Sequence, residues 1–313
     1  MLIIDTEKTR ALLPFEQLVP ALAQAFREEV QVPLRHNHAI HPDSAMPGCM
    51  LLMPAWNNQG FLGIKTVTIY PQNAAVGLPG LHSTYMLHSA TTGAPLALID
   101  GNEITSRRTA AASALAADYL SRAQSSSLLV VGAGRVASLL PYAYRVIRPI
   151  QRVAVWDINP AQATRLVDQL QADGFEAQVA DDLGQACAAA DIVTCATLST
   201  TPLIRREWLK PGTHLDLIGG FTPLMRESDD ACFDGTEVFI DTAEAPMKAG
   251  DLLSPLQSGV LQRTDIRADL AALCRDLHPG RTGETQITVF KAVGTALEDL
   301  AAAQLVYLQV TNN

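Results

Sequence analysis

The first third of the chain alternates apolar and polar positions as half-buried strands do. The segment 63–70 alternates Val and Ile with Thr, which predicts a strand. Three further strands are predicted over 50–53, 82–88 and 95–100. An amphipathic helix is predicted over 15–30, and an alanine-rich helix over 105–120, with Thr105 or Ser106 as its N-cap. This region is therefore expected to be an α+β domain.

After a short serine stretch at 125–127, the pattern changes to brief apolar strands separated by helices. The predicted strands are 128–131, 153–156, 177–180, 191–196, 214–218 and 238–240. Helices are predicted over 135–147 and over 160–172, the second with Asn159 as its N-cap. Apolar strands that alternate with helices predict an α/β fold with a parallel, doubly wound sheet. A last helix is predicted over 287–308 and is expected to leave this sheet.

A glycine-rich turn joins the first strand of the second region to its first helix. Its residues are Gly132, Ala133, Gly134, Arg135, Val136 and Ala137, a G-x-G-x-x-A pattern between a strand and a helix. Gly132 permits the tight turn, Gly134 lets the backbone approach a pyrophosphate, and Ala137 keeps the helix close to the strand. The N-terminus of the helix attracts phosphates. The pattern predicts a Rossmann domain that binds a dinucleotide.

The strand ends of this domain supply the remaining candidate cofactor residues. Asp157 ends the second strand, where a carboxylate accepts hydrogen bonds from the adenine ribose hydroxyls. It would repel a 2′-phosphate, and the next two residues carry no charge, so we expect NAD, with NADP as the alternative. Thr197 and Ser199 follow the fourth strand and Gly219 follows the fifth, where nicotinamide would lie. An ordinary loop is the alternative interpretation of 196–199.

Composition and charge narrow the class of protein. Of the 313 residues, 48% are hydrophobic, which suffices for one large or two medium domains, and the net charge of -9 opposes nucleic-acid binding. Neither a membrane-spanning stretch nor a signal peptide is expected. The odd number of cysteines, with no C-x-x-C pair, indicates reduced thiols in the cytoplasm. No metal site is expected, because His36, His38 and His41 lie in a predicted polar loop.

Three cations of the first region form a candidate substrate site. Lys65 lies inside a predicted strand, where a long cation is costly unless it has a partner. Arg108 lies in the first turn of a predicted helix, where a cation opposes the helix dipole and an anionic ligand would explain its presence. Together with Arg35 they could clamp a substrate carboxylate, an arginine giving a bidentate fork. The alternative is that each is a surface charge or a structural ion pair.

Segments spread over nearly the whole chain together resemble the ornithine cyclodeaminase/mu-crystallin family. They are 62–67, 93–105, 108–111, the glycine turn, 208–212, 249–251 and 287–291. The resemblance implies a substrate-binding and dimerisation domain of 1–122 and 287–313, with an NAD(P)-binding Rossmann domain of 123–286 between them. It also implies homodimers that form through the substrate domains.

The family includes several chemistries that share one kind of substrate. It holds ornithine cyclodeaminases, ketimine reductases, alanine dehydrogenase and crystallins that bind NADPH and thyroid hormone. The resemblance implies that Lys65 and Arg108, with Arg35, hold the carboxylate of a small amino or imino acid. The motifs by themselves do not separate these activities.

Two departures from the cyclodeaminase pattern favour a reductase. Cyclodeaminases carry an aspartate directly after the Gly-Gly of the fifth strand and a glutamate two residues before a Met-Pro, where this chain has Phe221 and Leu51. Loss of hydride from an amine needs a base, which these side chains cannot supply, whereas an iminium carbon is already electrophilic. We therefore expect a pyrroline-2-carboxylate or piperideine-2-carboxylate (ketimine) reductase. Ornithine cyclodeaminase and a non-catalytic, crystallin-type binding protein are the alternatives.

Overall fold

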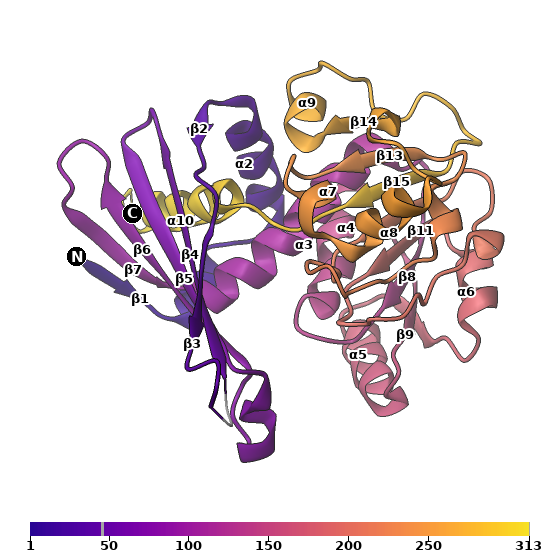
Figure 1. Ribbon diagram of the computed structural model, residues 1–313, viewed down its shortest axis with the longest axis horizontal. Helices are drawn as coiled ribbons and strands as arrows, with labels where there is room; N and C mark the ends of the chain where they lie inside the picture. The colour runs from indigo at the N-terminus through magenta and orange to yellow at the C-terminus, as the bar shows by residue number, and fades with distance from the viewer. Residues whose placement is uncertain (45–46, 313) are drawn as a thin grey trace. The chain divides into compact units, whose positions relative to one another are not determined.

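The computed structural model describes residues 1–44 and 47–312, which form two compact units (Figure 1). Unit 1 consists of Met1–Arg108 and Thr295–Asn313, and unit 2 of Thr109–Gly294. These boundaries differ from those expected at 122 and 287. Helix α3 (Gly101–Leu120) runs across the first boundary, and a strand that the sequence pattern does not predict adds residues to unit 2 before the second.

Unit 1 contains a mixed sheet with the strand order β1-β7-β6-β5-β4-β2, and β3 also pairs with β4. The strands are β1 (Leu2–Ile4), β2 (Val30–Gln31), β3 (His36–Ile40), β4 (Gly48–Asn57), β5 (Phe61–Ile69), β6 (Leu81–Ser89) and β7 (Pro95–Asp100). The four strands predicted for this region are confirmed as β4 to β7. The polar loop predicted around His36 and His38 is wrong, because this segment pairs with β4 as an antiparallel strand.

The helices of unit 1 are α1 (Thr6–Ala11), α2 (Phe15–Arg27), α10 (Ala296–Thr311) and the first part of α3, with a 3-10 helix η1 (Pro71–Val76). Helix α10 packs on β4, β5 and β6, and α2 packs on α10. The predicted N-cap of α3 is wrong. The helix begins one turn earlier, where the carboxylate of Asp100 accepts the Glu103 N–H at 2.8 Å. Arg108 therefore lies in the second turn, and the helix dipole no longer explains it.

The helix predicted over 287–308 is two elements. Strand β15 (Thr288–Lys291) comes first, and α10 follows after Gly294, at φ +75°, and Thr295, which caps the helix. β15 pairs with β12 on one side and with β13 on the other. All four of its residues are fully buried. Burial of this β-branched and aromatic segment between two strands overrides its helical spacing.

Unit 2 is a Rossmann domain with an eight-stranded parallel sheet of order β10-β9-β8-β11-β12-β15-β13-β14. Its other strands are β8 (Ser127–Val131), β9 (Arg152–Trp156), β10 (Glu176–Val179), β11 (Ile192–Cys195), β12 (His214–Leu217), β13 (Glu237–Ile240) and β14 (Ile266–Asp269). The chain winds outward from β8 to β10 and then in the other direction from β11. The predicted doubly wound sheet is thus confirmed, with its switch point between β8 and β11.

The helices of unit 2 connect these strands. They are α4 (Leu140–Ile147), α5 (Pro160–Ala172), α6 (Leu183–Ala189), α7 (Ala245–Lys248), α8 (Gly250–Ser258) and α9 (Leu270–Cys274), with short 3-10 turns η2 (Ala137–Leu139), η3 (Arg206–Trp208), η4 (Asp230–Phe233) and η5 (Arg263–Asp265). The Asn159 cap of α5 is confirmed. The α-helix predicted from residue 135 starts only at Leu140. Pro141 has no N–H to bond back to Ala137, so the preceding turn is the tighter η2.

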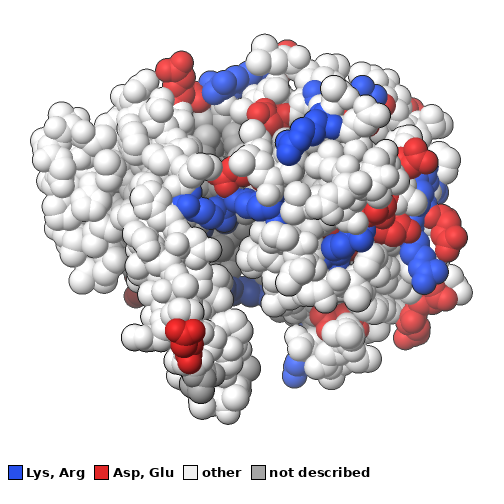
Figure 2. Space-filling model, in the orientation of Figure 1, with Lys and Arg blue, Asp and Glu red and all other residues white. Residues whose placement is uncertain are grey.

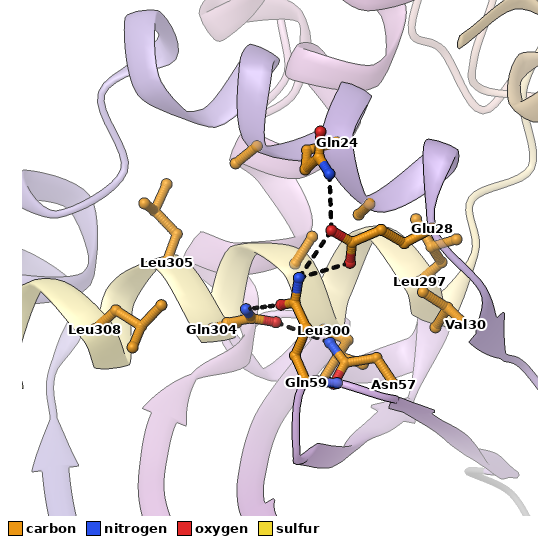
Figure 3. Close-up of a pocket in the computed structure, with 13 residues that line it drawn as sticks. Gln24, Glu28, Val30, Asn57, Gln59, Leu297, Leu300, Gln304, Leu305 and Leu308 are labelled. Carbon is orange, nitrogen blue, oxygen red and sulfur yellow. Dashed lines mark hydrogen bonds between the residues drawn. The ribbon is translucent and has the colours of Figure 1, made fainter. Parts of the chain in front are cut away.

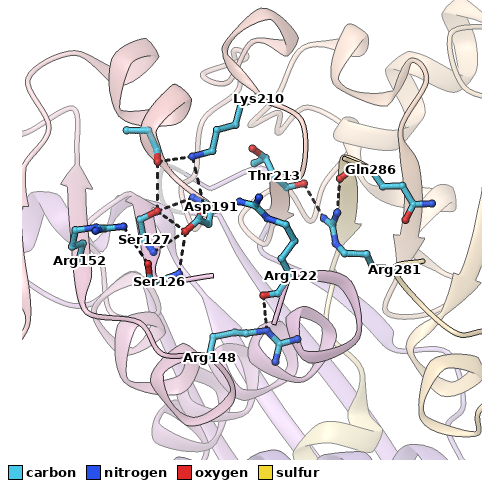
Figure 4. A network of polar contacts seen from close by, with 11 residues as sticks. Arg122, Ser126, Ser127, Arg148, Arg152, Asp191, Lys210, Thr213, Arg281 and Gln286 are labelled. Atoms are coloured by element: carbon cyan, nitrogen blue, oxygen red, sulfur yellow. Dashed lines mark hydrogen bonds and ion pairs between the residues drawn. The ribbon is translucent and has the colours of Figure 1, made fainter. Parts of the chain in front are cut away.

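The amino ends of the central strands are joined by a polar network around Asp191 (Figure 4). Oδ2 of Asp191 accepts the N–H groups of Ser126 and Ser127 at 3.0 and 3.2 Å, and the Ser127 hydroxyl at 2.8 Å. Oδ1 lies 2.7 Å from Nη2 of Arg122. Arg148 donates to the carbonyls of Ala117 and Arg122 near the end of α3. These bonds hold together the amino ends of the central strands, at the end of the sheet opposite to the glycine turn.

Among the described residues, no helix is both long enough and apolar enough to cross a bilayer.

Candidate active site

The glycine turn follows β8 at the switch point of unit 2. Gly132 has φ +105°, and a Cβ there would lie 2.8 Å from the carbonyl oxygen of Ala196. Both its conformation and its space therefore require glycine. Gly134 differs, because a Cβ at that position would meet nothing within 4 Å. No described atom of the protein requires this second glycine, and its open side leaves room for a ligand to approach the backbone.

The turn offers hydrogen-bond donors to an anion. The backbone N–H groups of Gly134, Arg135 and Val136 make no hydrogen bond within the described part of the chain. Ala137 is fully buried and starts η2, so the turn lies close against the sheet. Unpaired N–H groups at the start of a helix bind phosphates well. The geometry is suited to a pyrophosphate.

Asp157 connects the end of β9 to this turn. Its Oδ2 accepts the Ala133 N–H at 2.7 Å, and its Oδ1 accepts the Asn159 N–H at 2.7 Å. Asp157 therefore fixes the shape of the glycine turn, a role that the sequence did not indicate. Each carboxylate oxygen has a second lone pair for a further donor, such as a ribose hydroxyl.

A buried carboxylate links the ends of the next two strands. Oε1 of Glu227 accepts the backbone N–H and the hydroxyl of Thr197 at 2.7 and 2.9 Å, and Oε2 accepts the Gly219 N–H at 2.7 Å. Ser199 lies two residues beyond Thr197, and its hydroxyl donates to the Thr201 carbonyl at 2.6 Å. The structure thus joins Thr197 and Gly219 through a residue that the sequence analysis missed.

In unit 1, Lys65 and Arg108 meet two acidic residues at the start of α10. Nζ of Lys65 lies 2.8 and 2.7 Å from the two carboxylate oxygens of Asp299. Arg108 donates from Nε to Asp299 at 2.9 Å and from Nη1 to Glu298 at 2.5 Å. All four side chains are buried. We call these residues the cation cluster; its two positive charges are balanced by two carboxylates.

Burial and charge shift the pKa values of this cluster. Burial lowers the pKa of Lys65 to about 8, although Asp299 opposes the shift, and the charge of Arg108 adds to it. Burial alone would raise the pKa of Asp299, but its two cationic neighbours lower it overall. Burial opposes the charge of Arg108 as well, yet Asp299 and Glu298 raise its pKa. Arg108 is thus a permanent cation, whereas Lys65 loses its proton in mildly alkaline solution.

The cation cluster keeps a donor available for a further anion. The bonds of Arg108 use Nε and Nη1, and Nη2 makes no hydrogen bond with any described residue. Arg35 lies half-buried between β2 and β3. Lys65 and Arg108 lie together, because both donate to Asp299.

A buried row across the sheet surrounds Lys65. Its direct neighbours on β4 and β6 are Met53 and Tyr85. A Cβ at Gly63 would lie 2.0 Å from the Tyr85 hydroxyl, so glycine is needed there to leave room. Both neighbours are buried, which keeps water from the ammonium group. The low exposure of Lys65 thus follows from the register of three strands.

A hollow of about 160 Å³ lies between α2 and α10 in unit 1 (Figure 3). Its polar side chains bond to one another: Asn57 donates to Gln304 at 2.9 Å, Gln304 donates to Gln59, and Gln59 donates to Glu28 at 2.8 Å. Gln24 also donates to Glu28 at 2.8 Å. This chain of side-chain hydrogen bonds connects α10 to α2 and to β4. It helps to hold in place the helix that carries Asp299.

Glu298 and Asp299 were not predicted, although the sequence contains a weak indication of them. They are adjacent acids in the first turn of a mostly apolar helix, three and four residues after the cap Thr295. Acids there favour the helix dipole, which is sufficient reason for them without a partner. Only the fold shows that they face Lys65 and Arg108.

Phe221 and Leu51 stand where cyclodeaminases carry acids. Phe221 is half-buried directly after Gly220, and Leu51 is half-buried on β4, opposite Val67 of β5. Neither can take up a proton.

Comparison with known proteins agrees with this architecture. The sequence pattern of the ornithine cyclodeaminase/mu-crystallin family matches residues 2–313. The chain belongs to this family. It is 36% identical to a Δ1-pyrroline-2-carboxylate reductase of Colwellia psychrerythraea, with 98% of each chain covered. The match confirms the family expected from the sequence motifs.

Solved structures of family members are also similar. The Δ1-pyrroline-2-carboxylate reductase of Thermococcus litoralis, in complex with NADH and L-proline, is 31% identical with a TM-score of 0.94, covering 100% of this chain and 98% of its own. An archaeal alanine dehydrogenase dimer with bound NAD is 29% identical with a TM-score of 0.92, covering 100% and 97%. The expected α/β fold is therefore confirmed over the whole chain.

Proposed function

We propose that this protein is an NAD(P)H-dependent reductase of a small cyclic imino acid, Δ1-pyrroline-2-carboxylate or its six-membered homologue, piperideine-2-carboxylate. The observation that carries the proposal is the similarity, over the full chain, to a reductase that holds NADH and L-proline. Reduction adds one hydride to the imine carbon and one proton to the ring nitrogen, and yields a cyclic amino acid.

The residues of unit 2 fit a dinucleotide. The amides of Gly134, Arg135 and Val136, at the start of the helix, would hold its pyrophosphate, with Ala137 keeping that helix close to the sheet and Asp157 receiving the adenine ribose. Thr197, Ser199 and Gly219 would lie along its nicotinamide end. Asp157 favours NAD over NADP, because its charge would repel a 2′-phosphate. When bound, the cofactor supplies the hydride.

The residues of unit 1 would hold the substrate. Lys65 and Arg108 would bind the carboxylate of the imino acid, with Arg35 as a further candidate, and Asp299 would keep the first two in place. The protonated imine needs no base before it accepts hydride, because its carbon is already electrophilic. Ornithine cyclodeamination does need one, and Phe221 and Leu51 cannot serve.

An assay with purified protein tests the activity. Pyrroline-2-carboxylate and piperideine-2-carboxylate are each supplied with NADH or NADPH, and oxidation of the nicotinamide is followed by its absorbance. We expect turnover of at least one imine, with NADH preferred. Conversion of ornithine to proline with catalytic NAD would show a cyclodeaminase instead. Tight cofactor binding without turnover of either imine would favour a crystallin-type binding protein.

The pKa of Lys65 predicts a pH dependence of substrate capture. Lys65 is charged below about pH 8 and neutral above it, so its attraction for a carboxylate is lost as the pH rises. We expect kcat/KM for the imino acid to fall about tenfold per pH unit above this value. The variant Lys65→Arg stays charged throughout and should lack this descending limb. The same descending limb in both proteins would assign the titration to the substrate or to another group.

The outer face of the sheet in unit 1 favours a homodimer. One row across β4, β5, β6 and β7 consists of Pro54, Ile64, Met86 and Leu98, all half-exposed, and ends at Ile3, which is 77% exposed. Figure 2 shows a broad surface of unit 1, at left, without charged residues. Contiguous exposed apolar surface often marks an interface. A second copy of the chain is the proposed occupant, and an archaeal alanine dehydrogenase relative is also a dimer.

A charge placed on this row should separate the protomers. We expect Met86→Arg to reduce the mass measured by sedimentation from that of a dimer to that of a monomer. Leu277→Arg is the matched control, since Leu277 is 75% exposed but belongs to unit 2. A Met86→Arg protein that stays dimeric would place the interface elsewhere.

The five cysteines form no disulfides, which supports a reducing compartment, and we propose the cytoplasm.

A further inference from the structure

A chain of three buried charges lies beneath the carboxyl ends of β11 and β12. Glu227, Asp251 and Lys291 are all fully buried. Oδ1 of Asp251 accepts the Glu227 N–H at 2.7 Å, and Oδ2 accepts from Nζ of Lys291 at 2.9 Å. Lys291 thus holds Asp251, and Asp251 holds the backbone of Glu227. Each charge comes from a different element: the loop after β12, helix α8 and strand β15.

The Glu227 carboxylate then has the ends of two strands as its partners. It binds the N–H and hydroxyl of Thr197 after β11 and the N–H of Gly219 after β12, all within 2.9 Å. A buried carboxylate is costly unless it is well bonded, and three donors on two loops meet that need. One side chain thus bonds to both loops, beside the backbone bond from the Ile218 N–H to the Cys195 carbonyl at 2.9 Å that joins the same two strands.

The two glycines after β12 leave room for the Thr197 backbone and for these carboxylates. A Cβ at Gly219 would lie 2.5 Å from Oε1 of Glu227 and 1.8 Å from the Thr197 carbonyl. A Cβ at Gly220 would lie 2.4 Å from Oδ2 of Asp251. Neither glycine has a positive φ, so space and not backbone conformation requires them. The Gly-Gly pair and the three charges form one arrangement.

This arrangement lies at the place where a doubly wound sheet receives its ligand. Thr197 and Gly219 lie at the carboxyl ends of adjacent strands, and Gly132 contacts Ala196 beside them. We infer that Glu227 is a positioning residue for the nicotinamide end of the dinucleotide, because its carboxylate bonds to both the Thr197 loop and the Gly219 loop. Asp251 and Lys291 orient Glu227 in turn. The inference rests on the dinucleotide of the proposed function but not on the imino acid.

The variant Glu227→Gln tests this role directly. Glutamine offers one acceptor oxygen and one NH2 group, so one of the two loop amides would face a donor instead of an acceptor. We measure the Kd of NADH and of ADP-ribose, which contains the same phosphates and adenosine but no nicotinamide. We expect the Kd of NADH to rise about tenfold or more, and the Kd of ADP-ribose to change less than about twofold.

Asp191→Asn is the matched control. Asp191 also bonds two backbone amides and a hydroxyl, at the amino ends of the same central strands (Figure 4). The variant Asp191→Asn should lower the thermal stability. It should not change the Kd of NADH and the Kd of ADP-ribose by different factors. If Glu227→Gln does not fold, Glu227→Asp carries the test, because its shorter side chain cannot reach both loops. Equal weakening of NADH and ADP-ribose, or no weakening of NADH, would overturn the inference.

The binding measurement separates this inference from the proposed activity. It contains no imino acid. A wild-type protein that binds NADH but reduces neither imine would refute the proposed substrate and leave the role of Glu227 open to the same comparison. Turnover of an imine by the wild-type protein, together with unchanged NADH binding in Glu227→Gln, would support the proposed substrate and refute the role of Glu227.

Discussion

Replacement of Gly134 by valine is expected to weaken NADH binding by at least about 100-fold, or about 2.8 kcal/mol, with little change in stability. A Cβ at this position meets no protein atom within 4 Å, and Gly134 has no positive φ. The folded protein therefore tolerates the side chain. A pyrophosphate that approaches the backbone of the turn does not, because the valine methyl groups would occupy its place. Fluorescence titration and thermal unfolding measure the two effects.

The control for this variant is Gly283→Val in a loop of the same unit. A Cβ there comes no closer than 3.5 Å to any atom, so the substitution is equally mild for the fold. It should leave both NADH binding and the melting temperature unchanged. NADH binding by Gly134→Val at the wild-type level would mean that the dinucleotide does not approach this turn.

Replacement of Arg108 by lysine is expected to lower kcat/KM for the imino acid by about 100-fold, or about 2.8 kcal/mol. Lysine keeps the positive charge beside Asp299 and Glu298, so no buried carboxylate loses its counter-charge. It cannot, however, bind both acids and a third anion as the guanidinium can with Nε, Nη1 and Nη2. The KM for the imino acid should carry most of the loss, while the Kd of NADH should stay at the wild-type value.

The neighbouring Arg107 provides a matched control on the same helix. It also forms an ion pair with an acid, Glu103, at 2.8 Å, and donates to the Leu13 carbonyl. Arg107→Lys should retain wild-type kcat/KM. If Arg108→Lys were equally active, the cation cluster would be only a structural ion-pair network, as the alternative interpretation of these cations holds.

The fold was largely predictable because most of its information is local. The glycine turn, the Asn159 cap and the apolar strands 128–131 and 153–156 all coincide with structural elements. The errors arose where distant contacts outweigh local preference. Strand β15 has helical spacing but pairs on both sides with other strands, and the edge strand β3 forms only because β4 lies beside it. No local pattern contains this information.

In the candidate site, too, local sequence pattern predicted some residues, and contacts between distant residues decided the others. Lys65 stood out in the sequence because a cation inside a strand is unusual, and Arg108 because it was expected in the first turn of a helix, which the structure corrects to the second. Their partner Asp299 did not, since an acid in the first turn of a helix needs no special reason. Glu227 was equally inconspicuous in its loop, although it connects the ends of two strands. Opposite charges 191 or 234 residues apart are paired by the fold alone.

The sequence alone therefore determined the class of the domain, the glycine turn and the residue types suited to a dinucleotide and a carboxylate, because these depend on short spacings. The tertiary structure decided which acids neutralise the buried cations, and it showed that the Thr197 backbone and two carboxylates leave no room for a Cβ at Gly219 and Gly220. The pairing of these charges depends on their burial away from water, and the contacts depend on which atoms the sheet brings together. Which residues come within bonding distance in the folded protein cannot be read from their order in the sequence.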